Sequence, residues 1–282
     1  MTARAILVIA ALTLQEAARR RVLRSLAGLT VLLLGLSAWG FSRLDAEFGE
    51  FTSGESTIAA STILNLVMFG LSLIAALGTA FLAGPTLSGE IESGIALAIM
   101  TRPLRRSAVL VGKWAGLVIF GSGFIAVAGF AQLLIVRVTL GYWPPHPLAG
   151  LAFLAAQTTA LLTLGMLLST VISPMASGIV AVGLFGATWI AGVVGTIGEA
   201  FDNVGVARVG TVSRMLLPTD GLWRGAMNSF QHPALAAQIS SGIGESPLLS
   251  MTPLTTTYIG WVALWVVVVL GLAAIAFQRR DM

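Results

Sequence analysis

The side chains that could carry out chemistry in this chain are few and far apart. Among 282 residues there is no cysteine, and the two histidines are His146 and His232. Disulfides, thiolate catalysis and cysteine-ligated metals are therefore excluded. Gly112-Lys113 is followed by Trp114 and has no glycine five positions earlier, so the phosphate-binding pattern G-x-x-x-x-G-K-[ST] is absent. We expect a chain that is not an enzyme, holds no cofactor or metal, and does not itself hydrolyse ATP.

Carboxylates gather in two segments. One group, between residues 42 and 57, could bind a cation, but it more simply forms a solvated face that resists membrane insertion. The other is Glu90 and Glu92, which precede an apolar run, Ile95–Met100, and then three arginines. Acidic residues in the first turn and basic residues after the end favour a short helix, because they complement its dipole. Such an apolar helix would dock into a groove on another protein or rest on lipid.

Six long apolar stretches predict the framework that positions these residues. Most have the ~20 residues that a helix needs to cross a ~30 Å hydrocarbon core, and the first is shorter. The stretches are Leu26–Phe41, Ile63–Ala83, Trp114–Val136, Leu148–Leu168, Met175–Gly198 and Tyr258–Phe277. With 56% hydrophobic residues and no ten-residue alternation, the chain is predicted to be an all-α polytopic membrane protein, a single domain over residues 1–282. The second span is expected to break or kink at Gly84-Pro85.

None of the 28 charged residues lies inside these six stretches. Proteins that move a solute with protons or sodium usually keep an ionisable residue in their spans, so a channel or ion-coupled carrier is disfavoured. The energy for any transport must then come from another subunit. A membrane enzyme acting on a lipid or hydrophobic precursor is the alternative, but it should show clustered His, Asp or Arg at the membrane surface.

The basic residues predict the orientation of the chain. The N-terminus, the loop at residues 84–113 and the C-terminus together hold eleven of the sixteen Lys and Arg and four of the twelve Asp and Glu. Positive loops stay on the cytoplasmic side, so both termini are expected in the cytoplasm of a cell that carries this protein in its plasma membrane. The net charge of +4 therefore reflects membrane topology, and no nucleic acid is expected as a partner.

Two segments outside the spans, and the fifth span itself, have a predicted role. Residues 1–24 suit a helix on the cytoplasmic surface better than a cleaved signal, since three arginines stand where a cleavage site would be. Residues 199–257 form an outside loop whose composition predicts short amphipathic or re-entrant helices on the outer leaflet or at the mouth of the bundle. The fifth span is rich in glycine, for plain packing or for a pathway or dimer seam. The seam residues would be Gly183, Gly186, Gly192 and Gly195.

Residues 88–114 resemble the first cytoplasmic loop of ABC-2-type exporter permeases. That loop has two glutamates near a glycine, a short apolar helix, Pro-x-x-Arg, and Gly-Lys where the next span begins. The matching positions are Glu90, Glu92, Gly94, Pro103, Arg106, Gly112 and Lys113. The N-terminal residues 12–21 and the closing residues 277–281 also resemble this family, in the branch of the permease for nitrous-oxide-reductase copper maturation. Ile95 and Arg105 depart from the pattern, which affects how the loop would meet a partner.

The resemblance implies a permease subunit that works as two copies, identical or not, with two cytoplasmic ABC ATPase subunits. The loop would then be a coupling helix that docks on the ATPase, and the pathway would lie between the two permease copies. The ATPase-coupling residues would be Glu90, Glu92, Gly94, Leu97, Ile99, Pro103 and Arg106. Polar but uncharged spans suit a lipidic, peptide or drug-like cargo. The polar residues in question are Gln132, Gln157, Thr158, Thr159 and Thr163.

Overall fold

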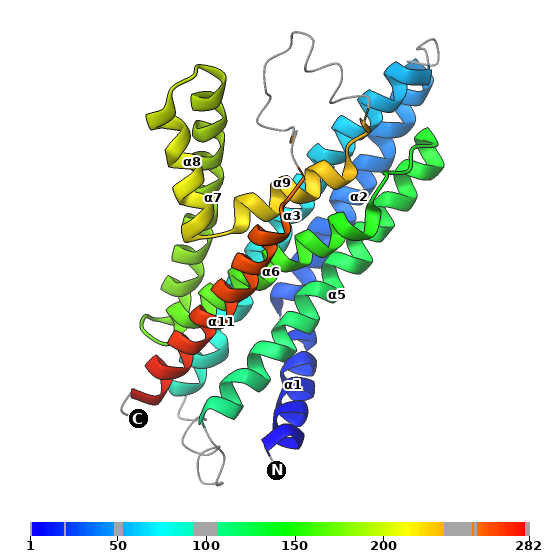
Figure 1. Cartoon of the computed structure of the whole chain (residues 1–282). Helices are drawn as coiled ribbons and strands as arrows, with labels where there is room; N and C mark the ends of the chain where they lie inside the picture. The colour runs from blue at the N-terminus through cyan, green and yellow to red at the C-terminus, as the bar shows by residue number, and fades with distance from the viewer. Residues whose placement is uncertain are drawn as a thin grey trace.

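The computed structural model describes residues 2–19, 21–47, 53–92, 106–233, 250 and 253–279. This part of the chain folds into α-helices and contains no β-strand, as the sequence predicts. In chain order the helices are α1 (Thr2–Arg19), α2 (Arg21–Glu47), α3 (Ser53–Glu92), α5 (Arg106–Leu140), α6 (Pro147–Ser169), α7 (Pro174–Ala200), α8 (Val204–Leu216), α9 (Thr219–Phe230) and α11 (Thr256–Arg279) (Figure 1).

Six of these helices are long and apolar enough to cross a membrane, namely α2, α3, α5, α6, α7 and α11. The six predicted spans are therefore confirmed as helices, and each helix extends beyond its apolar stretch. The first span is longer than its apolar run suggested, because α2 continues through flanking polar residues to 27 residues. At 1.5 Å per residue this gives about 40 Å, which is enough to cross the hydrocarbon core.

The expected break at Gly84-Pro85 does not end the second span. Helix α3 runs for 40 residues and contains Pro85 in its interior. Proline removes one backbone donor from the helical ladder, but two polar groups bind neighbouring carbonyls. The hydroxyl of Thr86 donates to the carbonyl of Leu82, and the ammonium of Lys113 donates to the carbonyl of Thr86 over 2.8 Å. The helix continues to Glu92, eight residues beyond Gly84, into the predicted loop.

Both chain termini lie at one end of the bundle, together with the end of α3 and the start of α5 (Figure 1). We call this the terminal end, and we call the opposite end, where α7 gives way to α8, the far end. Helices α3 and α6 lie at the centre. Helix α3 packs against α2, α5, α6 and α7, and α6 packs against α3, α5, α7, α9 and α11. Helix α2 lies at the periphery, where most of its apolar surface is exposed.

The N-terminal helix α1 packs along the first half of α5. Two glycines one turn apart on α5, Gly112 and Gly116, make this close approach possible. A Cβ atom at Gly116 would lie 2.6 Å from the carbonyl oxygen of Ala10 on α1. The small-xxx-small pattern at Gly112 and Gly116 thus serves packing within the chain. The opposite side of α1 carries exposed Leu7, Val8 and Leu12, and its position at a membrane surface stays a prediction.

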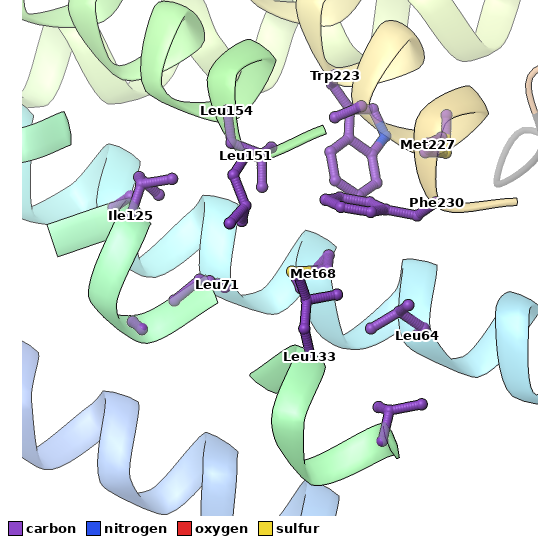
Figure 2. Packing of buried hydrophobic residues seen from close by; sticks show 14 of the residues in the cluster. Leu64, Met68, Leu71, Ile125, Leu133, Leu151, Leu154, Trp223, Met227 and Phe230 are labelled. Carbon is purple, nitrogen blue, oxygen red and sulfur yellow. The ribbon is translucent and has the colours of Figure 1, made fainter. Parts of the chain in front are cut away.

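Two short helices, α8 and α9, lie between the fifth and sixth spans, where short amphipathic or re-entrant helices were predicted on the outer leaflet or at the mouth of the bundle. Helix α9 is buried rather than exposed at the surface. Nearly all of its residues are buried, and Trp223, Met227 and Phe230 join the main hydrophobic core with side chains from α3, α5 and α6 (Figure 2). Gly150 on α6 leaves room for the ring of Phe230, because a Cβ at that position would overlap the ring. Helix α9 therefore fills the far end of the bundle from within.

The turn between α5 and α6 fixes the end of α9. Tyr142 is buried, and its hydroxyl donates to the carbonyl of Phe230 over 2.7 Å. Burial raises the pKa of Tyr142 above its usual value, so the hydroxyl stays protonated as a donor. The guanidinium of Arg137 lies 5.1 Å from the centre of the exposed Trp143 ring, a cation–π contact. Of the two aromatic residues in this turn, Tyr142 is therefore packed in the interior and Trp143 is exposed.

We predict that Gly116→Val lowers the thermal unfolding midpoint of the purified protein, because the new side chain meets the backbone of α1. Overpacking of this kind costs about 1–3 kcal/mol. Gly123→Val is the matched control. Gly123 lies on the same helix, α5, but a Cβ atom added there would have no other atom within 4 Å. The two variants share the same change in helix propensity, so an equal shift in both would contradict the proposed packing of α1.

Candidate functional site

The predicted coupling residues that can be placed lie at the terminal end. Glu90 and Glu92 belong to the last turn of α3, and Arg106 is the first residue of α5. Gly94, Leu97, Ile99 and Pro103 lie outside the described residues, so the coupling helix itself stays a prediction. The structure shows which helices the loop connects. It joins α3 to α5, two long helices that pack against each other in the bundle.

Both helices that flank this loop are held by hydrogen bonds from basic side chains. Lys113 is buried, at 4% exposure, and its bond to the carbonyl of Thr86 joins α5 to α3. Arg106 donates through Nη1 to the carbonyl of Gln278 over 3.3 Å, which joins the start of α5 to the last turn of α11. A cation at a helix C-terminus is favourable because carbonyls there lack helical partners. A displacement of the loop would therefore reach α3, α5 and α11 together.

The four glycines predicted for a pathway or dimer seam divide into two pairs. Gly183 and Gly186 have no atom within 4 Å of an added Cβ, so they lie on an open face of α7. Gly192 and Gly195 face the interior, where Gly192 contacts the carboxylate of Asp220 and Gly195 contacts Gly210 on α8. The second pair lets α8 and α9 approach α7 within the same chain. Of the four predicted seam residues, Gly183 and Gly186 are therefore the two that remain available for contact with a second copy of the chain.

Three of the five polar residues singled out in the spans, Gln132, Gln157 and Thr163, bind side chains of other helices. Gln132 on α5 donates to the hydroxyl of Ser37 on α2 over 2.6 Å, and Ser72 on α3 donates to Gln157 on α6 over 3.0 Å. The indole of Trp114 donates to the hydroxyl of Thr163 over 2.9 Å. Thr158 is buried, while Thr159 is partly exposed, and both hydroxyls bind carbonyls of their own helix. These groups stabilise helix packing in lipid, so they say little about cargo.

A buried group of charges, missed by the sequence analysis, lies where α7, α8 and α9 meet. Asp220 on α9 is buried, and its Oδ2 accepts from Nε of Arg214 and from Nε of Arg224, each over 3.0 Å. Arg224 also donates through Nη2 to the carbonyl of Gly192 and to the hydroxyl of Thr196, over 2.9 and 2.8 Å. Through these bonds the group links α9 to α8 and to α7.

Helix α8 runs antiparallel beside α7 at the side of the bundle and ends about halfway along α7, where Ser213 binds the carbonyl of Thr188 (Figure 1). Its C-terminal carbonyls need partners there, because water is absent from the hydrocarbon core. Three aromatic side chains of α11 donate to them: the hydroxyl of Tyr258 to Arg214, the indole of Trp261 to Met215, and the indole of Trp265 to Leu216, over 3.1, 3.3 and 2.8 Å. Helix α11 therefore caps α8, and α8 is re-entrant.

The same helix α11 makes polar contacts at both of its ends. Its last turn accepts the hydrogen bond from Arg106 at the terminal end, and its first turns donate to α8 toward the far end. In the described residues, six helices are long and apolar enough to cross a membrane, α8 turns back beside α7, and no cluster of three or more potential metal ligands is present.

Comparison with known protein families gives a match that covers nearly the whole chain. The family described as ABC-2 family transporter protein matches residues 7–282. The chain belongs to this ABC-2 family. A comparison with curated proteins finds no match. The resemblance drawn from the loop at residues 88–114 is thereby confirmed at the level of the family. As an ABC-2 protein, the chain is a membrane component of a transporter, in a family whose members generally work with an ABC ATPase.

The functional features of this ABC-2 protein that the sequence analysis missed lie in α8, α9 and α11. One signal was readable in advance: Tyr258, Trp261 and Trp265 have i, i+3, i+7 spacing, which places three donors on one face of the last span. Amphipathic donors buried in lipid need acceptors. The pairing of Arg214 and Arg224 with Asp220 had a weaker signal, since Asp220 and Arg224 are four residues apart on one short helix.

We predict that Asp220→Asn destabilises the protein by about 3 kcal/mol or more, because it leaves two arginines beside α7 without a countercharge. The unfolding free energy in mild detergent is the measurement. Asp202→Asn is the matched control: Asp202 is exposed and has a φ of 52°, a conformation that Asn also tolerates. A loss of stability at Asp220 no larger than that at Asp202 would contradict a structural role for the charge group.

Proposed function

We propose that this chain is the permease subunit of an ATP-driven exporter, and that it takes its energy from a separate cytoplasmic ATPase. The observation that carries the proposal is the setting of the loop between α3 and α5. Its sequence has the pattern of an ABC-2 coupling loop, the chain belongs to that family, and the loop's two flanking helices are bonded to each other and to α11. The chain has no nucleotide-binding pattern of its own.

The transport cycle we propose begins when ATP closes a pair of ATPase subunits. Each ATPase would hold the apolar run Ile95–Met100 of one permease copy in a surface groove, where burial of the apolar side chains favours docking. Movement of that run would displace the ends of α3 and α5, and the bonds of Lys113 and Arg106 would carry the displacement to neighbouring helices. Helix α11 would carry it onward to α8 through its aromatic caps.

Two copies of the chain would meet along the open face of α7. That face presents Gly183 and Gly186 between exposed Ile179 and Ile190. Exposed apolar side chains alone are unremarkable in lipid, but glycines on a helix face allow two backbones to approach closely. The cargo pathway would then lie between the copies, with α8 and α9 of each copy at its far end. The orientation with both termini in the cytoplasm follows from the positive charge of the terminal end.

We predict that Leu97→Asp combined with Ile99→Asp abolishes capture of the ATPase, because docking would bury charges that have no partner. The measurement is recovery of the co-expressed ATPase with the tagged permease, together with stimulated ATP hydrolysis in vesicles. Glu92→Lys serves as a comparison and should have a smaller effect, since an exposed ion pair contributes about 0–1 kcal/mol.

The wild-type permease, the double Asp variant and the Glu92→Lys variant should insert equally well into the membrane, because the substituted residues lie outside the spans. Full recovery of the ATPase by the Asp variant, with normal ATP hydrolysis, would show that the loop only rests on lipid. ATP hydrolysis by the purified permease without an ATPase would contradict the proposal as a whole.

A further inference from the structure

A cavity of about 370 Å³ lies beside α7, directly below the end of α8. Its walls come from four helices, with Leu164 on α6, Ala187 and Ala191 on α7, Leu216 on α8 and Trp265 on α11. The volume falls within the ~300–1,000 Å³ typical of small-molecule sites. Ala187 and Leu216 are exposed, so the cavity opens sideways from the bundle. We call it the α7–α11 groove.

The polar groups that line the α7–α11 groove already have partners within the chain. The hydroxyl of Thr188 donates to the carbonyl of Phe185 over 2.9 Å, and the hydroxyl of Ser213 donates to the carbonyl of Thr188 over 3.4 Å. The indole of Trp265 donates to Leu216. A polar ligand would therefore lose its own hydrogen bonds to water and gain few in return. The groove suits a purely apolar occupant.

The depth of the groove identifies the source of that occupant. Its α7 residues lie nine to sixteen residues before Ala200, which is about 14–24 Å from the far end of that helix. Helix α7 is about 40 Å long and the hydrocarbon core ~30 Å thick, so the groove opens at hydrocarbon depth. The apolar molecules present at that depth in every membrane are the acyl chains of its phospholipids.

A positive charge stands at the level where the headgroup of such a lipid would lie. Gly198 and Gly195 on α7 contact Ala207 and Gly210 on α8, so Arg208 lies level with the last turns of α7. Arg208 is exposed, and no side-chain partner binds it among the described residues. Between Arg208 and the groove, α8 presents an exposed apolar strip of Val209, Val212 and Leu216. A charge near the membrane surface above an apolar strip and a deeper groove matches the shape of one phospholipid.

We propose that the α7–α11 groove binds one acyl chain of a phospholipid from the leaflet at the far end, and that Arg208 binds the phosphate of the same lipid. The proposal goes beyond the transport role, because a resident lipid would bind whether or not an ATPase is present. The lipid would fill the space between α7, α8 and α11, and so it would support the re-entrant helix from its open side.

The test is phospholipid binding to the purified, delipidated chain, measured by native mass spectrometry after titration with phosphatidylglycerol. We expect one tightly bound lipid per wild-type chain. Ala191→Phe fills the groove and should weaken binding about tenfold or more, because the displaced methylenes lose their apolar site. Ala126→Phe is the matched control, because Ala126 is exposed on α5 and lies outside the groove and the proposed contact face, and this variant should bind within about twofold of wild type.

A second comparison isolates the phosphate contact. Arg208→Gln should weaken binding of phosphatidylglycerol several-fold and leave binding of diacylglycerol, which has no phosphate, unchanged. Unfolding midpoints close to wild type would show that the variants are folded, and Ala187→Phe replaces Ala191→Phe if that variant does not fold. Equal lipid binding by wild type and both groove variants would overturn the proposal. So would a groove variant that changes the oligomeric state and not lipid binding, since a second copy would then occupy the groove.

Discussion

The termination of a helix inside the membrane is the constraint on which the far half of this structure depends. Helix α8 ends beside the middle of α7, where its last carbonyls have neither a helical partner nor water. An unsatisfied carbonyl in hydrocarbon costs several kcal/mol. The hydrogen bonds from Tyr258, Trp261 and Trp265 remove that cost, so the position of α8 and the sequence of α11 are linked.

The other contacts at the far end follow from the same re-entry. Helix α8 approaches α7 closely where Gly195 meets Gly210, and the turn after it brings Asp220 against Gly192. Asp220 lies between two arginines, so the charges that enter the bundle are paired rather than isolated. The chain can then continue into α9, which fills the core with Trp223 and Phe230. Because α8 turns back beside α7, α9 can fill the core at the far end with apolar side chains. The same path of the chain buries the charges of Asp220 and its two arginines.

The sequence predicted the six spans well, because the position of a membrane span depends almost entirely on the length of its apolar stretch and on the absence of charge within it. No charged residue interrupts any of the six stretches, and helices formed at all six. Local rules were less reliable. A break or kink was expected at Gly84-Pro85, but α3 continues through Pro85 to Glu92. The composition of residues 199–257 predicted short helices on the outer leaflet or at the mouth of the bundle. The burial of α9 among α3, α5 and α6 depends on three-dimensional contacts that the sequence alone does not show. The coupling residues at Gly94, Leu97, Ile99 and Pro103 lie outside the described residues and remain predictions.

The central claim is that α8 re-enters the bundle and ends at hydrocarbon depth. Because the chain has no cysteine, a single spin label can be placed at Leu216, which is 71% exposed, and another at Val204, which is 64% exposed at the start of the same helix. Collision rates with oxygen and with a water-soluble nickel chelate then report the depth of each label in a lipid bilayer. The structure predicts that the label at Leu216 meets oxygen often and nickel rarely, whereas the label at Val204 meets nickel readily. Equal access of nickel to both labels would contradict the re-entrant helix.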